Sequence, residues 1–357
     1  MDLRVLDSIY CPKVKGNGNR LNYFLPPQQT LFFAYGRQAF IEGLKMIGLK
    51  QGEKILLPEY ICNDIPGSLK ETEIEPVFYR VNKDLTPDYL QIKKLMSPFC
   101  KTLLIVNYFG FPQPWEPIKE LKSISELMVI EDNAHGFLSK DKDCLLGFKG
   151  DIGIFSLRKT IALPNGGALV VNNDKLIKKN AAFEKLKNNK FNKYFRKSEI
   201  KYCLKECARP LMASGGGSFR GIVLNTYREA KKYLGIDKNN SLNVEKQVLE
   251  ECFSYYSKLL LCKTNFKKEI KRRRVLYFAV NEFIKGVKGC TPLYNDLAAG
   301  VVPYGYPFYC HGENIESFQK LLLQDGLISV NWPELPSNVA SSAPEFYKKI
   351  LLIPFLW

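Results

Sequence analysis

Short apolar runs alternate with amphipathic segments through the first half of this 357-residue chain. The runs are nearly continuous in apolar side chains, a pattern typical of strands whose two faces are both buried in a parallel sheet. Helical spacing of apolar residues is clearest between them at 37–47 and 117–124. This alternation predicts an α/β fold, a mainly parallel sheet covered by helices. The expected strands are 54–57, 76–81, 102–108, 127–131, 152–157 and 168–171.

The second half of the chain has a different character. Residues 175–245 are rich in lysine and asparagine and predict helices interrupted by Gly215-Gly216-Gly217 and by Asn239-Asn240. We expect a large domain over 1–245, with 175–245 as an enlarged basic helical region, and a smaller C-terminal α/β domain over 246–357. The expected elements of the smaller domain are a helical stretch at 247–285 broken near 263–265, a strand at 306–310, a helix at 315–325 and a strand at 327–331.

Composition narrows the class of protein. Hydrophobic residues make up 46% of the chain, which is enough for a large core. No apolar stretch reaches the roughly 18 uncharged residues that cross a membrane, and the N-terminus lacks the basic and apolar segments of a signal peptide. The ten cysteines are scattered without a CxxC pair, so we expect reduced thiols and no metal site. A cytoplasmic protein is the prediction.

Positive charge is concentrated in two segments of a chain whose formal net charge is +16. Ten Lys/Arg and two Glu lie between 175 and 201, and a second basic run occupies 267–274. Such charge is typical of chains that meet a nucleotide-linked substrate, an anionic membrane surface or nucleic acid. The alternative is that these lysines and arginines lie on solvent-exposed faces of helices and bind no partner. Aromatic residues within 175–201 keep weak peripheral membrane contact open, whereas no motif supports nucleic-acid binding, so none is expected.

A lysine and an acid stand at the ends of two expected strands. Lys159 follows Ser156 in a Ser-x-x-Lys sequence, and Asp132 directly follows the expected strand 127–131. Pyridoxal phosphate (PLP) chemistry requires such a pair, because the amine forms an imine with the cofactor aldehyde and the carboxylate keeps the pyridine nitrogen protonated. Each residue alone is as compatible with a surface lysine or a solvated loop acid. Their order and spacing together favour a PLP site.

From about Phe32 to Asn172 the chain resembles the DegT/DnrJ/StrS-type sugar aminotransferases, which are fold-type I PLP enzymes. The resemblance implies a large domain with a mainly parallel, seven-stranded type of sheet, a smaller C-terminal α/β domain, PLP as cofactor and a homodimer. The matching blocks are Gly36-Arg37-Gln38-Ala39, Leu57-Pro58-Glu59-Tyr60, Val106-Asn107-Tyr108-Phe109-Gly110-Phe111-Pro112, Ile130-Glu131-Asp132-Asn133-Ala134-His135, Gly150-Asp151-Ile152-Gly153-Ile154-Phe155-Ser156, and Lys159 with Gly166-Gly167-Ala168.

The resemblance also implies roles for individual residues. Lys159 corresponds to the Schiff-base lysine, which also moves the substrate proton, and Asp132 to the partner of the pyridinium nitrogen. His135 matches a position near the phenolic oxygen of the cofactor, where a packed structural histidine is the alternative. The implied phosphate site is made by Gly36, Arg37, Gln38 and Ser156. Tyr60 is placed over the cofactor ring, and Cys62 competes with it for that position.

Three departures from the family pattern are visible. Many members have two more residues between the serine and the lysine, although Lys159 keeps the seven-residue distance to Gly166. Many have an acid where this chain has Asn165. The family loop that reaches the neighbouring subunit has no convincing match, and the nearest string is 221–228.

The resemblance implies transfer of an amino group from an amino acid, with glutamate as the expected donor, to a keto acceptor. A nucleotide-linked keto sugar for cell-surface polysaccharide synthesis is the expected acceptor. Two alternatives stay open. One is a different PLP reaction at the same site, such as a dehydration or an elimination. The other is a catalytically idle protein of the PLP fold that binds a partner.

Overall fold

The computed structural model describes residues 21–187, 199–200, 202–203, 252–312, 315–324 and 327–355. Its strands are β1 Thr30–Phe33, β2 Lys54–Pro58, β3 Glu75–Tyr79, β4 Thr102–Val106, β5 Met128–Asn133, β6 Lys140–Asp141, β7 Cys144–Leu145, β8 Ile152–Ser156, β9 Gly167–Val171, β10 Cys290–Pro292, β11 Gly305–Cys310, β12 Val330–Asn331 and β13 Ile350–Pro354. Its helices, with η for the 3-10 type, are α2 Leu21–Phe24, α3 Gly36–Ile47, α4 Asp64–Ser68, η1 Leu69–Glu71, α5 Tyr89–Leu95, η2 Tyr108–Gly110, α6 Glu116–Ser123, α7 Leu157–Thr160, α8 Asp174–Lys179, α9 Ala181–Lys187, α13 Tyr255–Lys263, α14 Phe266–Lys285, α15 Ile315–Gln324, α16 Ser337–Ala340 and α17 Glu345–Lys349.

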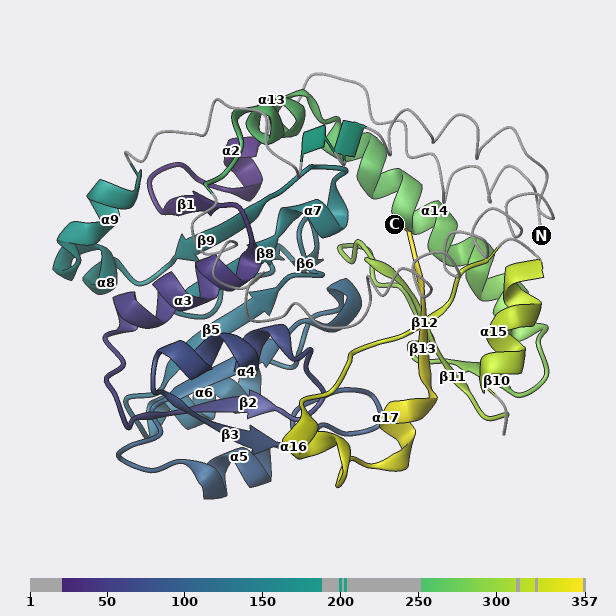
Figure 1. The fold of residues 1–357 in the computed structure, drawn as a ribbon, viewed down its shortest axis with the longest axis horizontal. Helices are drawn as coiled ribbons and strands as arrows, with labels where there is room; N and C mark the ends of the chain where they lie inside the picture. The colour runs from purple at the N-terminus through teal and green to yellow at the C-terminus, as the bar shows by residue number, and fades with distance from the viewer. Residues whose placement is uncertain are drawn as a thin grey trace.

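A mainly parallel sheet forms the larger part of the described structure (Figure 1). Its seven described strands follow the order β1-β9-β8-β5-β4-β2-β3, and only β9 runs antiparallel to its neighbours. Every residue of β4, β8 and β9 is buried, which means that both faces of the sheet centre are covered. The α/β prediction is therefore confirmed. The edge strand β1, with four residues, was not predicted from the sequence. The strand predicted at 102–108 ends two residues earlier, at Val106, before the turn that begins η2.

A second, antiparallel sheet lies toward the C-terminus, with strand order β10-β11-β13-β12 in the described residues. The helix α14 packs against β10 and β11, and Figure 1 shows it running from α13 down one side of this second sheet towards α15. The predicted helix break is confirmed, because α13 ends at Lys263 and the Asn265 side chain caps α14 by accepting from the Lys268 N–H at 3.0 Å. The predicted strand at 327–331 is shorter than expected, and the central strand β13 was not predicted.

The predicted domain boundary at 245/246 lies outside the described residues and stays a prediction. The first described residues after it pack against the large sheet, where Phe253 stacks on Phe32 with ring centroids 5.2 Å apart. The basic region 175–201 is described in α8 and α9, and most of the rest lies outside the described residues. Among the described helices, none is both long and apolar enough to cross a bilayer, and the described residues contain no cluster of metal-ligating side chains.

Gly153 in β8 is a position where the fold depends on the absence of a side chain. A Cβ atom there would lie 2.3 Å from the carbonyl oxygen of Gly147, whose own φ is +90°. We expect Gly153→Ala to lower the free energy of unfolding by about 3 kcal/mol, because the obstacle is rigid backbone. Chemical denaturation measures the loss. Gly67→Ala, where nothing lies within 4 Å of the added Cβ, is the control, and equal losses in both variants would contradict the explanation.

Candidate active site

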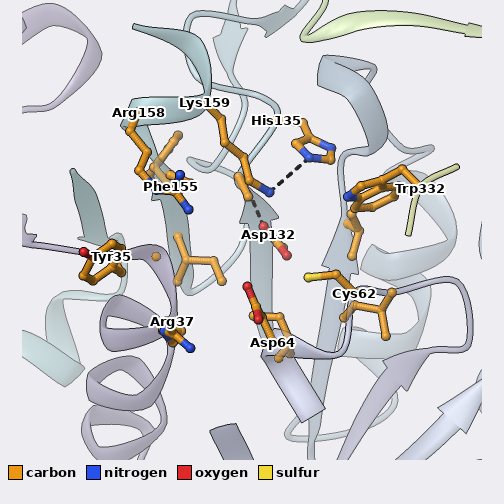
Figure 2. Close-up of a pocket in the computed structure, with 17 residues that line it drawn as sticks. Tyr35, Arg37, Cys62, Asp64, Asp132, His135, Phe155, Arg158, Lys159 and Trp332 are labelled. Atoms are coloured by element: carbon orange, nitrogen blue, oxygen red, sulfur yellow. Dashed lines mark hydrogen bonds between the residues drawn. The ribbon is translucent and has the colours of Figure 1, made fainter. Parts of the chain in front are cut away.

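Three segments bring the predicted site residues to one edge of the large sheet (Figure 2). Asp132 stands near the carboxyl end of β5, Ser156 ends β8 and leads into α7 with Lys159, and Gly36 begins α3. Carboxyl ends of parallel strands are where α/β sheets collect ligands. The segments enclose a cavity of about 720 Å³, including its open mouth. It is lined by Tyr35, Gly36, Arg37, Ile61, Cys62, Asp64, Ile65, Val106, Asp132, Ala134, His135, Ile154, Phe155, Ser156, Arg158, Lys159 and Trp332.

Lys159 and His135 meet inside this cavity. The Lys159 Nζ lies 3.2 Å from the His135 Nε2, and Figure 2 shows both side chains pointing toward one another. The His135 ring is 3% exposed. It stacks on Tyr304 with centroids 4.4 Å apart, faces Phe109 at 5.7 Å and meets the edge of Trp332. Burial, and then the nearby Lys159 charge, holds the pKa of His135 well below its usual value. The ring is therefore neutral near pH 7.

Asp132 presents a carboxylate to the same cavity. Its Oδ1 accepts from the Ala134 N–H at 2.8 Å, and the side chain is 6% exposed. Burial raises the pKa of Asp132, an effect that the Ala134 N–H and the Lys159 charge partly oppose. A buried carboxylate in this state is stabilised as an anion by any cationic group that binds beside it. The site is thus suited to a ligand with a protonated nitrogen at this position.

The start of α3 forms a cradle beside Ser156. Within the described residues the N–H groups of Gly36 and Arg37 have no hydrogen-bond partner, as expected for the first turn of a helix. A Cβ at Gly36 would lie 3.4 Å from the Phe155 oxygen and 3.5 Å from the Ser156 Cβ, so the start of the helix lies within van der Waals reach of the end of β8. Free N–H groups, the Arg37 guanidinium and a hydroxyl together make a site suited to a phosphate.

Two predicted cofactor residues lie outside the cavity lining. Gln38 is buried, and its Oε1 accepts from the Tyr35 N–H at 2.9 Å, so it supports the helix start rather than facing the cavity. Tyr60 is also buried, with its hydroxyl donating to the Trp332 carbonyl and its ring packed on Tyr108. Tyr60 is therefore not among the residues that line the cavity, whereas the competing position, Cys62, is. Which of the two lies over the cofactor ring stays a prediction. After β2 the chain turns, so the strand alternation could not decide between them.

Several lining residues were not predicted. Arg158 was left out of the predicted site, yet it lines the cavity with its guanidinium 5.8 Å from the Tyr35 ring centroid. Asp64 at the start of α4 also lines it. Trp332 comes from beyond α15, almost 200 residues from His135 in sequence. A contact between residues so far apart in sequence cannot be recognised from local sequence patterns. Arg158, in contrast, could have been predicted to line the cavity because it is adjacent to Lys159.

The glycine pair and Asn165 have structural roles behind the site. A Cβ at Gly167 would lie 2.3 Å from the carbonyl carbon of Tyr35, so only glycine allows β9 to approach the start of α3. The Asn165 Oδ1 accepts from the Ser254 N–H at 3.2 Å and from the Ser257 hydroxyl at 3.0 Å. Asn165, a departure from the family pattern, thus fixes the N-cap and the first turn of α13. The nearest match to the family loop that reaches the neighbouring subunit, 221–228, lies outside the described residues.

The low pKa of His135 has a consequence for the pH dependence of stability. In the unfolded chain a histidine protonates near pH 6.5, whereas the folded protein keeps this ring neutral to lower pH. The unfolded state therefore takes up the proton first, and the free energy of unfolding falls as pH drops below about 6.5. We expect His135→Gln to lose less stability than the wild type between about pH 7.5 and 5.5. Denaturation at both pH values measures this, with His311→Gln as the control for loss of a histidine.

Sequence comparison identifies relatives of this chain. A model of the DegT/DnrJ/EryC1/StrS aminotransferase family matches residues 18–208. GDP-perosamine synthase from Escherichia coli O157:H7 is 32% identical over 145 residues, 40% of each chain. A dTDP-4-amino-4,6-dideoxy-D-glucose transaminase from Shigella dysenteriae is 29% identical over 172 residues, 47% of this chain and 46% of that one. The matches thus span less than half the length of these curated relatives.

Solved structures resemble nearly the whole chain. PseC from Helicobacter pylori, an aminotransferase involved in the biosynthesis of pseudoaminic acid, has a TM-score of 0.64 at 17% identity and covers 98% of this chain and 90% of its own. Spr1654 from Streptococcus pneumoniae, in its PLP form, has a TM-score of 0.61 at 12% identity and covers 98% of this chain and 89% of its own. At these identities the comparison concerns the fold, and it confirms the predicted fold-type I architecture.

Proposed function

Because the chain belongs to the DegT/DnrJ/EryC1/StrS aminotransferase family, we propose that its cavity holds pyridoxal 5′-phosphate and that it transfers amino groups. The observation that carries the proposal is the meeting of Lys159, Asp132 and the cradle at Gly36 in one cavity. Bound there, the cofactor would be linked through its aldehyde to the Lys159 amine and would supply an electron-accepting ring.

The chain's own residues fit this cofactor. The Asp132 carboxylate, buried and facing the cavity, would accept a hydrogen bond from the protonated ring nitrogen and gain a directly bonded cationic partner in addition to the nearby Lys159 charge. The N–H groups of Gly36 and Arg37, with the Ser156 hydroxyl, would bind the phosphate. The role predicted for Gln38 becomes a supporting one, since it does not line the cavity.

Lys159 and His135 are the groups placed to handle a proton. A neutral imidazole with Nε2 at 3.2 Å from an amine can accept a hydrogen bond from it, which orients the Lys159 Nζ within the cavity. The tight stack on Tyr304 prevents the ring from rotating away. Lys159, once free, would carry the substrate proton as general base and acid, and His135 would keep its amine aimed at the reacting atoms.

We propose a nucleotide-linked keto sugar as acceptor and glutamate as amino donor. The named sequence relatives act on GDP- and dTDP-linked sugars. In the part of the chain that the structure describes, neither Arg37 nor Arg158 pairs with a carboxylate, so both leave positive charge at the cavity for an anionic substrate. A homodimer, a cytoplasmic location and weak membrane contact through 175–201 remain predictions from the sequence.

An absorbance scan of the purified protein with PLP, before and after adding L-glutamate, tests the proposal. We expect a visible-edge band from the lysine-linked cofactor that disappears in favour of the pyridoxamine form. A keto acid such as 2-oxoglutarate should restore the band. A protein that binds no PLP, or whose band is unaffected by every amino acid tried, would reject the proposed activity and favour the idle binding protein. Loss of ammonia without the pyridoxamine form would favour an elimination.

A further inference from the structure

Three consecutive arginines of α14 hold three different parts of the chain. Arg272 pairs with Glu269 at 2.6 Å and donates to the Phe355 carbonyl at 3.3 Å. Arg274 donates to the carbonyls of Ala298 and Val301, both at 2.7 Å. In the basic run 267–274, which the sequence suggested as a surface for anionic partners, the guanidinium groups of Arg272 and Arg274 thus bind other parts of this chain.

Arg273 reaches the active site. Its guanidinium is fully buried, with 0% of the residue exposed. Nη2 donates to the Thr160 carbonyl at 2.7 Å and lies 3.4 Å from the Lys159 carbonyl. Nη1 donates to the carbonyls of Pro303 and Tyr304, both at 3.0 Å. One planar group therefore ties the end of α7, which carries Lys159, to the segment that carries Tyr304.

Glu269 makes this buried cation tolerable. It lies one helical turn before Arg273, and its Oε1 accepts from the Arg273 Nε at 2.7 Å. Burial alone would raise the pKa of Glu269, but its hydrogen bonds and ion pairs with Arg272 and Arg273 outweigh burial and lower it. The pair therefore stays charged, with the Arg273 Nε on the Glu269 carboxylate and both Nη atoms on backbone carbonyls.

The contacts form a closed ring of interactions. Arg273 holds the backbone of Lys159–Thr160 on one side and the backbone of Tyr304 on the other. The Tyr304 ring lies parallel to the His135 ring, with an interplanar angle of 1°. His135 in turn meets the Lys159 Nζ. A shift of either backbone segment at Arg273 would change the Lys159–His135 contact.

We propose that Arg273, neutralised by Glu269, is a positioning residue that sets the contact between the Lys159 Nζ and the His135 Nε2. This inference rests on the proposed function of the same cavity. The end of α7 needs such a support, because a four-residue helix has almost no internal hydrogen-bond ladder and its last carbonyls are orphans. A lysine cannot replace Arg273, since a single ammonium cannot reach carbonyls on two segments in a fixed plane.

Histidine-selective NMR of the full-length protein without cofactor tests the geometry directly. The chain has two histidines, His135 and His311, so the exposed His311 serves as internal reference. In Arg273→Lys we expect the ring signals of His135 to move, because its stack on Tyr304 and its contact with Lys159 both change. Arg272→Lys alters the same helix and the same Glu269 but keeps the direct hydrogen bonds of Arg273 to both active-site segments, and should leave His135 unmoved.

The loaded enzyme gives the second measurement. We expect the rate of the glutamate half-reaction to fall about 10²-fold in Arg273→Lys, as for a misplacement of about 1 Å, while Arg272→Lys stays close to wild type. If Arg273→Lys does not fold, Arg273→Gln is the second variant: its neutral amide cannot reach both backbone segments, and it should also move the His135 signals. Unmoved His135 signals, or equal effects of both arginine variants, would overturn the inference. Because the NMR arm needs no cofactor, a protein that fails to bind PLP would reject the proposed function while leaving this test intact.

Discussion

Lys159→Ala is expected to abolish amino-group transfer, with a loss of about 10⁴-fold or more in the rate of the glutamate half-reaction. The substitution removes both the amine that would anchor the cofactor and the group that would carry the substrate proton. PLP should still enter, since Asp132 and the cradle at Gly36 are untouched, but the band of the lysine-linked cofactor should be missing. Stopped-flow absorbance with glutamate measures the rate.

Two further variants separate loss of the amine from general damage. Lys119→Ala removes an exposed lysine that pairs with Glu116 at 3.1 Å on the surface of α6, and should keep full activity. Added methylamine should partly restore proton transfer in Lys159→Ala, because the alanine leaves room for a small amine near His135. A Lys159→Ala protein that converts PLP to its pyridoxamine form at the wild-type rate would show that another residue moves the proton.

The proximity of the two proposed catalytic residues, Asp132 and Lys159, was predictable because each follows a strand that the sequence marks clearly. The apolar runs before Asp132 and Ser156 fix two parallel strands, and parallel strands present their carboxyl ends at one edge. Spacing therefore sufficed to bring Asp132 and Lys159 together. His135, three residues after Asp132 in the turn that leaves β5, was predicted only through the family resemblance.

The surroundings of His135 could not be predicted in the same way. Tyr304 and Trp332 reach it from the C-terminal part of the chain, and neither periodicity nor spacing encodes a contact across so many residues. The burial of Arg273 was equally hidden. Glu269 and Arg273 show the i,i+4 spacing of a helical ion pair, but such pairs are usually exposed, and arginine is rarely buried completely. The local sequence therefore indicates an ion pair between Glu269 and Arg273, but not that the pair faces the interior of the protein.

Two described strands, β1 and β13, were not predicted from the sequence. β13, Ile350–Pro354, is as apolar as the predicted strands and lies at the centre of the second sheet between β11 and β12. The last strand predicted from the sequence, 327–331, lies before it. β1 is an edge strand with a half-buried end, so its apolar run is short and competes with the loop residues around it. For β1, pairing with a distant strand rather than propensity decides the structure, whereas the apolar run of β13 is itself typical of a strand and was a usable signal.

Asp132→Asn is expected to separate activity from stability. The amide keeps the shape of the side chain and can still accept from the Ala134 N–H, but it cannot hold a proton on a ring nitrogen. We expect the half-reaction to slow by about 10²- to 10⁴-fold. Without cofactor the variant should be at least as stable as the wild type near pH 7. Burial raises the pKa of Asp132, so the folded protein binds this proton more tightly than the unfolded chain, and keeping the group ionised at neutral pH opposes folding.

The sign of this pH dependence gives the experiment its second readout. Because the folded pKa of Asp132 is raised, its effect destabilises the fold progressively as pH increases above the unfolded value of about 3.9. Asp132→Asn removes that effect, so the melting temperatures of the two apoproteins should differ more at pH 7 than at pH 4. Asp64→Asn is the matched control, since this carboxylate also lines the cavity but is exposed. If Asp64→Asn slowed the half-reaction as much as Asp132→Asn, simple loss of negative charge in the cavity would explain both, and the specific pairing of Asp132 with the cofactor nitrogen would be wrong.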